Sequence, residues 1–432
     1  MKAHKILAVA VASVGLLASQ HAAEAADLGG NCCADLEERI AELEATTARK
    51  GNRKVSLKIS GWVAEQVVSW DDGVESNTYV TGLGTAFASN VNFTGKAQVT
   101  NDFSVGYVLH VELITSDVYT TNQNVSSGGA ALSGGGPNSA QVLYSYWFAQ
   151  SERLGRFSVG MQSPADDSAV VALDSSGTLQ AAYWVAYDVF GFGVRGNFAP
   201  GDSLIWGNAS SCRGYGGGPG DCNGVPINVV RYDSPTIGGF SASASWGEDD
   251  NWAVALRYIN VNFGDFTLKG LVTYSETTQE SKGAPRGGAL EYTQASIYMQ
   301  HNPSGWFAHG AWGHIDQDVN PLNNPASDTW YVKSGIRLNP TSLGATIPYG
   351  EYLHATDSAF LVNDGGTAND TSDDVGRVAR GSEATFWGFG VVQEIDAAAM
   401  SVWLRYREHE VDVPGVQTRD MSTIVFGGFI NF

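Results

Sequence analysis

The last nine residues of the chain constrain its fold more than any other segment. Residues 424–432 read IVFGGFINF, with an apolar or small residue at every second position and an aromatic residue at the very end. The termini of soluble domains usually fray into water, where a final phenylalanine has no role. A closed barrel removes both edges of its sheet and needs apolar residues toward lipid. The segment therefore indicates the closing strand of a membrane barrel, with Phe432 at the closure, although the last strand of a soluble sandwich also fits it.

The first 25 residues have the layout of a secretory signal peptide. Lys2 and Lys5 precede an apolar run at 6–18, and small residues stand at Ala23 and Ala25. That run is too short to span a bilayer, and no other stretch reaches the ~20 apolar residues that a transmembrane helix needs. We therefore expect an exported protein that crosses a membrane by strands.

The charge and cysteine content narrow the classes of partner. The 432 residues include 25 Lys and Arg against 45 Asp and Glu, a formal net charge of −20, which argues against nucleic acid as a partner. An exported protein can form disulfides. Cys212 and Cys222 enclose a short glycine-rich loop and are predicted to be bonded. Cys32 and Cys33 are adjacent in the chain and cannot easily bond to each other, so disulfides between subunits are the alternative for these two residues.

Segments of strand length alternate between apolar and polar residues along the whole chain. VSLKIS at 55–60 and VNFTGKAQV at 91–99 place Lys58 and Lys96 opposite their apolar faces. Such a period of two indicates strands whose faces meet different solvents. We count about 16 strands, an even number as in bacterial barrels. They begin near residues 54, 85, 103, 138, 156, 226, 239, 250, 265, 289, 305, 328, 344, 382, 399 and 419.

The connections between these strands differ in length in a regular way. Short turns near 100–102, 236–238 and 262–264 alternate with long polar stretches at 116–137, 276–288 and 358–381. Membrane barrels gather short turns at one end and long loops at the other. The expected fold is all-β, a 16-stranded antiparallel transmembrane barrel over 54–432. Its lipid-facing aromatic girdle is predicted from Trp62, Tyr107, Tyr146, Trp252, Tyr274 and Trp403.

Four segments carry a resemblance to a known family. RFSVGMQSP at 156–164, RYDSPTIGGF at 231–240 and FTL at 266–268 resemble strand signatures of general diffusion porins, and DLEERIAELE at 35–44 resembles the region before the barrel. Together with Phe432 they are most similar to the alphaproteobacterial porin family, over essentially all of the mature chain. General porins usually have an arginine facing the pore after the glycine at 160, and this chain has Met161.

The resemblance implies a passive, water-filled channel for ions and small hydrophilic solutes, narrowed by a loop after the fifth strand. That pore-constricting loop three would be 163–225, with its acidic residues Asp166, Asp167, Asp174 and Asp188. These carboxylates would face basic residues on the barrel wall, namely Lys58, Lys96 and Arg231. A transverse field of this kind selects by size and charge, and the excess of acids predicts a modest preference for cations. The alternative for each acid is a solvated loop charge.

Residues 26–53 form a separate unit, a periplasmic coiled-coil segment and linker. Leu36, Ile40 and Leu43 fall at the a and d spacing of a heptad, which predicts a short coiled-coil helix, with a disordered acidic spacer as the alternative. With the porin resemblance this predicts a homotrimer. The resemblance also implies outer-membrane localisation, contact with lipid and lipopolysaccharide, and recognition of the C-terminal strand by the barrel-assembly machinery.

Two other classes of function remain as alternatives to a porin, an outer-membrane barrel hydrolase and a secreted sugar-binding β-protein. GDSL at 201–204 resembles a lipase nucleophile motif, but the expected strand context and a partnered Asp-x-x-His are absent, so no enzyme is predicted. No cofactor or metal is predicted, although one aspartate-rich loop could bind calcium or simply be solvated; its acids are Asp364, Asp370, Asp373 and Asp374.

Overall fold

The computed structural model describes residues 54–84, 87–114, 116, 121–126, 139–167, 171–182, 189–209, 226–278, 289–317, 325–363 and 375–432. Within these, Lys58–Phe432 forms one compact unit. The predicted signal peptide and the coiled-coil seam of Leu36, Ile40 and Leu43 lie outside the described residues. The described residues therefore belong almost entirely to the barrel and its connections.

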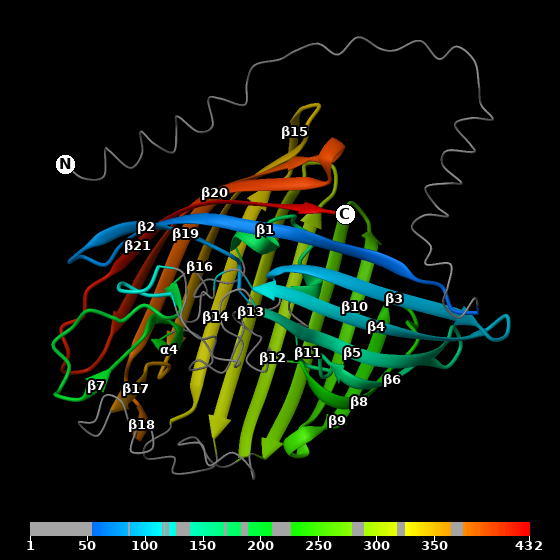
Figure 1. Cartoon of the computed structure of the whole chain (residues 1–432), viewed down its shortest axis with the longest axis horizontal. Coiled ribbons are helices and arrows are strands. Elements are labelled where there is room, and N and C mark those ends of the chain that lie inside the picture. Colours follow the sequence, from blue (N-terminus) through cyan, green and yellow to red (C-terminus); the bar gives the residue numbers. More distant parts are fainter. Residues whose placement is uncertain are drawn as a thin grey trace. The chain divides into compact units, whose positions relative to one another are not determined.

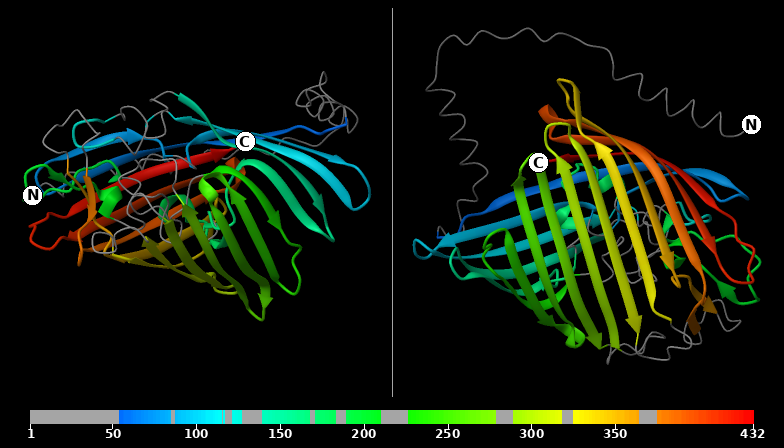
Figure 2. Two further views of the ribbon diagram at one scale, coloured as in Figure 1. Left: turned by 90° about the horizontal axis from the view of Figure 1, so that it is seen from below. Right: turned by 180° about the vertical axis from the view of Figure 1, so that it is seen from behind.

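Eighteen strands join into one sheet that closes on itself (Figure 1). Sixteen of them follow one another around the ring, in the order β1 (Lys58–Asp71), β3 (Ser89–Gln98), β4 (Phe103–Ile114), β5 (Ser139–Ser151), β6 (Gly155–Gln162), β8 (Ile227–Asp233), β9 (Phe240–Gly247), β10 (Trp252–Phe263), β11 (Phe266–Thr278), β12 (Ala289–His301), β13 (Trp306–Gln317), β14 (Ser327–Ile336), β16 (Gly344–Thr356), β19 (Glu383–Ile395), β20 (Met400–Asp412) and β21 (Met421–Asn431). Every pairing between neighbours is antiparallel, and Figure 2 shows the wall from two further sides.

Two short strands extend positions that already belong to this ring. β2 (Ser76–Thr81) pairs with the far part of β1, where β3 no longer reaches, and β15 (Leu338–Thr341) continues β14 along β16. The 18 strands therefore occupy 16 positions, which confirms the predicted 16-stranded antiparallel barrel. All 16 predicted starts lie within four residues of a strand start. What the prediction missed is that the second position begins earlier, with β2 at Ser76, and breaks at 82–88 before β3.

The ring closes where the last strand meets the first. β21 pairs with β1 from Trp62 opposite Asn431 to Asp71 opposite Ser422. Beyond that ladder, the Gly61 N–H donates to the Phe432 carbonyl over 3.1 Å, and the Phe432 N–H donates back over 3.0 Å. The final residue thus adds the last two hydrogen bonds of the closure.

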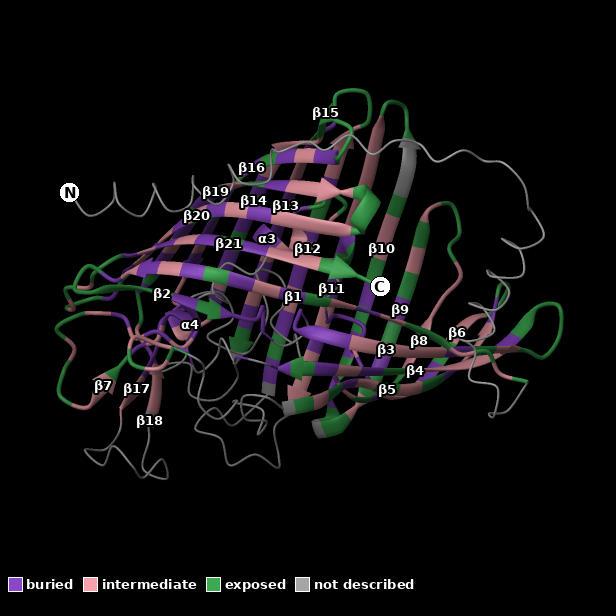
Figure 3. Ribbon diagram, turned by 45° about the horizontal axis from the view of Figure 1, so that its top comes forward, coloured by how far each residue is buried: buried purple, intermediate pink, exposed green. Residues whose placement is uncertain are grey.

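Burial alternates along the strands as two different surroundings require (Figure 3). On β1, Ile59 and Val63 are about half exposed on the outer face, whereas Ala64 and Val68, at even positions, are buried. Large apolar residues cover the outer face of the other strands in the same way. Among its most exposed aromatics are Trp147, Trp246, Trp330 and Phe389.

Three residues of the predicted aromatic girdle are on the wrong face. Trp62 and Trp403 share the inward register of β1 and β20, and Tyr146 lies inward on β5. Trp403 is 2% exposed, and the Trp62 indole N–H donates to the Phe87 carbonyl. The register against the neighbouring strands determines which face a side chain takes, and a slip of one residue reverses it. Register also places Met161 on the outer face. Met161 pairs with Ser145, which lies two residues before exposed Trp147 and therefore on the same face of β5.

The two ends of the barrel carry different connections. One end, here called the short-connection end, has turns such as 99–102, 152–154, 264–265 and 302–305, and both β1 and β21 meet there. The opposite end carries the long connections. The longest of them, residues 163–226 between β6 and β8, contains η2 (Val171–Leu173), α3 (Leu179–Ala182), β7 (Asp202–Ser203) and α4 (Trp206–Ala209), and is called the inner segment.

Smaller elements complete the described part of the chain. β17 (Phe360–Asn363) and β18 (Val375–Val378) form a small sheet with β7 of the inner segment. Short 3-10 turns, η5 (Glu248–Asp250) and η7 (Asp396–Ala398), occupy two of the strand connections. None of the helices in the described ranges has the length and apolar character to span a bilayer.

The closure of the barrel predicts that Gly61 is sensitive to substitution. A Cβ at Gly61 would lie 2.1 Å from the Asn90 carbonyl oxygen of β3 and 2.8 Å from the Phe432 ring, so Gly61→Ala must displace β1 from β3 and disturb its closing contact with Phe432. We expect the unheated barrel band in detergent gels to convert to the unfolded band at a lower temperature. Gly270→Ala on β11 is the matched control, since a Cβ there would approach the Ser296 carbonyl oxygen only to an ordinary 3.9 Å. Equal conversion temperatures for the two variants would contradict this account of closure.

Candidate functional site

Exposure of the inward-facing side chains differs between the two sides of the barrel. On β12 to β20 these side chains are mostly buried: Tyr298, Tyr331 and Arg407 are all 0% exposed. On β3 to β8, the inward residues Lys96, Tyr144 and Arg156 are partly or fully exposed. In the described part of the chain, water therefore reaches the wall formed by β3 to β8, and that open wall is the candidate functional site.

The inner segment covers the other side, and the backbone of its first residues is held by wall side chains. The Arg231 guanidinium on β8 donates to the carbonyls of Ser163 and Pro164 over 3.0 and 3.1 Å. Further round the ring, Arg257 on β10 donates to the Ala165 carbonyl and Gln294 on β12 to the Asp166 carbonyl, over 2.9 and 2.6 Å. Every second strand along this part of the ring thus holds the next part of the segment, so the segment follows the inner wall.

A buried ion pair fastens the middle of the inner segment. Asp174 pairs with Lys333 of β14, and both side chains are 0% exposed. Burial alone would raise the pKa of Asp174, but the positive charge of Lys333 and the hydrogen bonds from Lys333 and Ser176 outweigh it and lower that pKa to about 2. Asp174 is therefore ionised at neutral pH and neutralised by the wall.

The C-terminal end of α3 meets a cluster of charges on the wall. Arg405 donates to the Ala181 carbonyl over 2.6 Å, and Arg407 donates to the Ala182 carbonyl over 3.1 Å. Arg407 also forms a buried ion pair with Glu351 of β16 at 2.6 Å. The last carbonyls of a helix lack partners within it and carry partial negative charge, so two guanidinium groups are well suited to this end.

Aromatic packing holds the second half of the inner segment. Trp206 in α4 is 1% exposed, and its ring contacts Phe386 of β19 and His409 of β20 with centroids 5.9 and 5.8 Å apart. Ser358, in the connection after β16, donates to the Ala209 carbonyl at the end of α4. This part of the segment is therefore fixed against the wall by both apolar and polar contacts.

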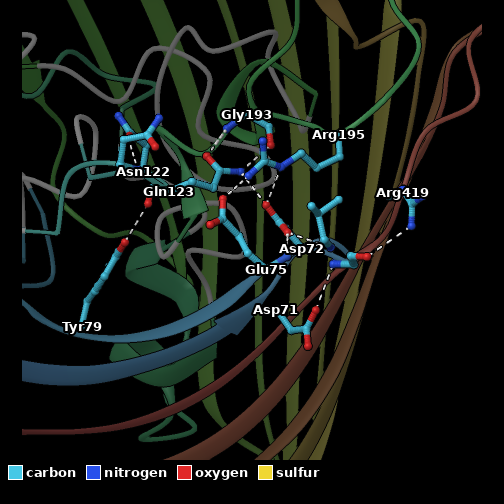
Figure 4. Close-up of polar contacts among 12 residues, drawn as sticks. Asp71, Asp72, Glu75, Tyr79, Asn122, Gln123, Gly193, Arg195 and Arg419 are labelled. Atoms are coloured by element: carbon cyan, nitrogen blue, oxygen red, sulfur yellow. Dashed lines mark hydrogen bonds and ion pairs between the residues drawn. The ribbon is translucent and has the colours of Figure 1, made fainter. Parts of the chain in front are cut away.

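The long-connection end adds a polar clamp around Arg195 (Figure 4). The Arg195 side chain bonds to Asp72 over 2.6 Å and also pairs with Glu75, both in the hairpin between β1 and β2. Gln123 donates to Asp72 and to the Gly193 carbonyl. Burial would raise the pKa of Asp72, but hydrogen bonds from the Glu75 N–H and the Arg195 guanidinium bring it below its usual value. The clamp joins the inner segment to the first hairpin.

The predicted acidic residues of the constriction occupy less open positions than expected. Asp166 and Asp167 are 0% and 4% exposed, and Asp174 is paired with Lys333 rather than facing Lys58 or Lys96. The inner segment lies against the wall, so its described acids contribute little free charge to the lumen. Asp188 lies outside the described residues, as do Cys212, Cys222 and the aspartates at 364, 370, 373 and 374.

The predicted basic residues lie on the inner face of the wall. Lys58 is the first residue of β1, and Lys96 lies near the end of β3, both exposed and both toward the short-connection end. Arg231 lies on β8, where Asp233 and two backbone carbonyls accept its hydrogen bonds. Among the described residues, no group of three or more His, Cys, Asp or Glu side chains could hold a metal ion.

Sequence reasoning missed the bases that anchor the inner segment and one base on the open wall. These are Arg257, Lys333, Arg405, Arg407 and, on the open wall, Arg156. A signal for part of this set was present: in β20, Arg405, Arg407 and His409 stand at every second position, which gives the strand one charged face. The partner of that face could not be read from the strand itself.

Comparisons with known proteins agree with this architecture. A family profile described as Gram-negative porin matches residues 8–428. The chain is similar in structure to an anion-selective porin from Comamonas acidovorans, at 13% identity and a TM-score of 0.54, covering 88% of this chain and 100% of that one. No curated protein sequence matches the chain.

Two further solved structures are similar at low identity. OmpT of Vibrio cholerae in its trimer form shares 11% identity, with a TM-score of 0.51 and coverage of 88% of this chain and 99% of that one. OmpF of Salmonella typhi in complex with daunomycin shares 11% identity, with a TM-score of 0.50 and coverage of 88% and 98%. At these identities the structural neighbours support the fold alone.

The ion pair of Asp174 with Lys333 predicts that the effects of substitutions at these two positions are strongly coupled. Asp174→Asn leaves Lys333 buried without its counter-charge, and breaking a buried pair in this way costs about 3–5 kcal/mol. We expect a noisier single-channel current, because the inner segment loses an anchor, and a lower unfolding temperature. Adding Lys333→Met should recover much of the loss, because no unpaired charge remains. Single and double variants that are equally destabilised would contradict the coupling.

The same pair predicts an acid transition. Because the pKa of Asp174 falls from 3.8 to about 2, its contribution to stability is fully present above pH 4 and is lost as the pH falls toward 2. Current noise of the wild-type channel should therefore rise over that interval. The Asp174→Asn, Lys333→Met double variant serves as the control and should lack this component. An identical acid response in both proteins would exclude Asp174 as its source.

Proposed function

The chain belongs to the Gram-negative porin family, and on this premise we propose that its barrel conducts ions and small hydrophilic solutes passively along the open wall of β3 to β8. The observation that carries the route is the unequal exposure of the inner wall: the β12 to β20 side is covered by the inner segment, whereas Lys96, Tyr144 and Arg156 remain accessible. The protein is a multi-pass outer-membrane β-barrel.

Family membership favours a channel over the two alternatives considered from the sequence. An outer-membrane barrel hydrolase would need a nucleophile with a partnered base. The GDSL segment offers a serine, but the sequence lacks the partnered Asp-x-x-His. Ser203 of that segment lies in β7, paired with β17, and donates to the Val362 carbonyl. A secreted sugar-binding protein would not explain a closed barrel with an apolar outer face. The motifs at 156–164 and 231–240 support placing the chain in the alphaproteobacterial branch of the family.

We propose further that wall bases dominate charge selection. The described acids of the inner segment are buried, whereas Lys58 and Lys96 project inward and are exposed at the short-connection end. A concentration of like charges along a narrow water path attracts counter-ions and repels co-ions. This proposal replaces the modest cation preference expected from the count of loop acids.

A homotrimer is proposed as the assembled form. Its support is the porin family, the heptad spacing of Leu36, Ile40 and Leu43, and the trimer form of the structurally similar OmpT of Vibrio cholerae. Proposals that rest on the sequence alone are the signal peptide at 1–25, the Cys212 to Cys222 disulfide, and partnership with lipopolysaccharide and the barrel-assembly machinery.

Charge selection has a direct electrical test. In planar bilayers the purified protein should give stable conductance steps, and a salt gradient should give a reversal potential that reports its preference. Lys58→Gln with Lys96→Gln should shift that potential toward cations, and the shift should shrink at high salt as the Debye length falls below ~10 Å. Arg153→Gln, on the exposed β5 to β6 turn, controls for net charge. An unchanged potential would remove both lysines from the conduction path.

Assembly has a separate test. Deleting residues 27–50 should weaken the trimer while each barrel still conducts, because the deleted segment precedes β1. Native mass measurement in detergent gives the subunit number, and bilayer recordings give the conductance per barrel. A full-length protein that is monomeric would contradict the coiled-coil proposal.

A further inference from the structure

A polar pocket of about 280 Å³ lies on the open wall. Its lining residues are not those that anchor the later residues of the inner segment. Its lining comes from the inward faces of β5, β6 and β8 and from Ser163, where the inner segment begins. Ligand pockets commonly measure ~300–1,000 Å³, so this one suits a small solute. Its position beside the open wall places it within the proposed conduction path.

One cation in this pocket has most of its bonding capacity free. Arg156 carries five N–H groups, and its described hydrogen bond is a single donation to the Tyr146 hydroxyl over 3.2 Å. In the part of the chain that the structure describes, no carboxylate forms an ion pair with Arg156. The guanidinium carbon lies 4.0 Å from the centre of the Phe148 ring and 5.5 Å from that of Tyr146, so both rings attract the cation.

The neighbouring charges do not neutralise Arg156. Asp233 lies directly across from it on β8, but both carboxylate oxygens of Asp233 accept hydrogen bonds from Arg231, and Ser243 donates to one of them over 2.6 Å. The remaining Arg231 nitrogen, Nη1, donates to backbone carbonyls. Arg231 and Asp233 thus cancel, and the pocket keeps a net positive charge from Arg156.

The other walls of the pocket are flat rings and neutral polar groups. The rings of Tyr144 and Tyr146 stand at 76° to each other with centroids 6.4 Å apart, and both side chains are partly exposed. Ser158 donates to Gln162 over 2.7 Å, so this pair is already satisfied. The site therefore combines a planar cation with aromatic faces and has no competing free acid among its lining residues.

From this arrangement we propose that the pocket is a binding subsite for small organic carboxylates, especially those whose carboxylate is attached to a flat ring. This proposal rests on the proposed channel function. A guanidinium fork matches a carboxylate in two parallel hydrogen bonds, and the tyrosine rings pack against an aromatic or planar body. Arg156 contacts the carboxylate, and the subsite raises the local concentration of such solutes beside the channel. Their passage is then favoured over that of neutral solutes of equal size.

Benzoate and its neutral counterpart benzamide test the subsite. Calorimetric titration of the detergent-solubilised protein and block of single-channel current should both detect benzoate binding, with benzamide at least ten times weaker. Arg156→Gln should weaken benzoate binding by about tenfold or more, as expected for a lost hydrogen bond between charged groups. The affinity of Arg156→Lys for benzoate should fall between that of the wild type and that of Arg156→Gln, because lysine keeps the positive charge but lacks the forked donor geometry of the guanidinium.

Arg153→Gln is the matched control, since it removes the same charge from the neighbouring β5 to β6 turn, outside the pocket, and should change benzoate binding less than twofold. Heat-shifted migration in detergent gels checks that every variant forms a barrel. Equal effects of Arg156→Gln and Arg153→Gln, or equal binding of benzoate and benzamide by the wild type, would overturn the subsite. Absence of any conductance in simple salt would instead overturn the proposed channel function, so the two failures are distinguishable.

Discussion

Backbone hydrogen bonding between β1 and β21 is the contact on which the rest of this structure depends. No water is available in the hydrocarbon layer to bond a free strand edge, so a sheet there must close into a ring. The ladder from Trp62 to Asp71, completed by the two bonds of Gly61 with Phe432, removes both edges at once. Closure also creates an enclosed interior, which holds both the inner segment and the open wall.

The interior is divided by the way in which the inner segment is fastened. Ion pairs buried in a protein gain little stability over apolar contacts, but they penalise any arrangement that leaves one charge unpaired. Lys333 with Asp174, and Arg407 with Glu351, therefore act mainly by excluding other positions of the segment. Guanidinium bonds to the carbonyls of the buried residues Ala165, Ala181 and Ala182 act in the same direction, since each carbonyl would otherwise lose this partner in the interior.

This fastening changes the electrostatics of the channel. A segment rich in aspartate places negative charge in the lumen only if its carboxylates face water, and here Asp166 and Asp167 are buried and Asp174 is paired with Lys333 of the wall. The bases that remain partly or fully exposed are Lys58 on β1 and Lys96 and Arg156 on the open wall, all near the short-connection end. A strongly acidic chain can therefore enclose a locally basic passage, because net charge reports the whole molecule and selectivity depends on the few charges along the water path.

The amino-acid sequence by itself determined the barrel: alternation within each strand, the lengths of the connections and the apolar ending at Phe432 were enough for 16 strands and for nearly all of their starts. It also indicated that 163–225 is a special connection, because a hairpin needs far fewer residues. It did not determine that Trp62 and Trp403 face inward, that Asp174 meets Lys333, or that Arg156 has no acidic partner among the described residues. Alternation is a property of consecutive residues and can be read locally, whereas the face of a strand depends on its register with its neighbours. The partner of a charge depends on which residues distant in the chain the closed ring brings together, and only the tertiary structure decided that.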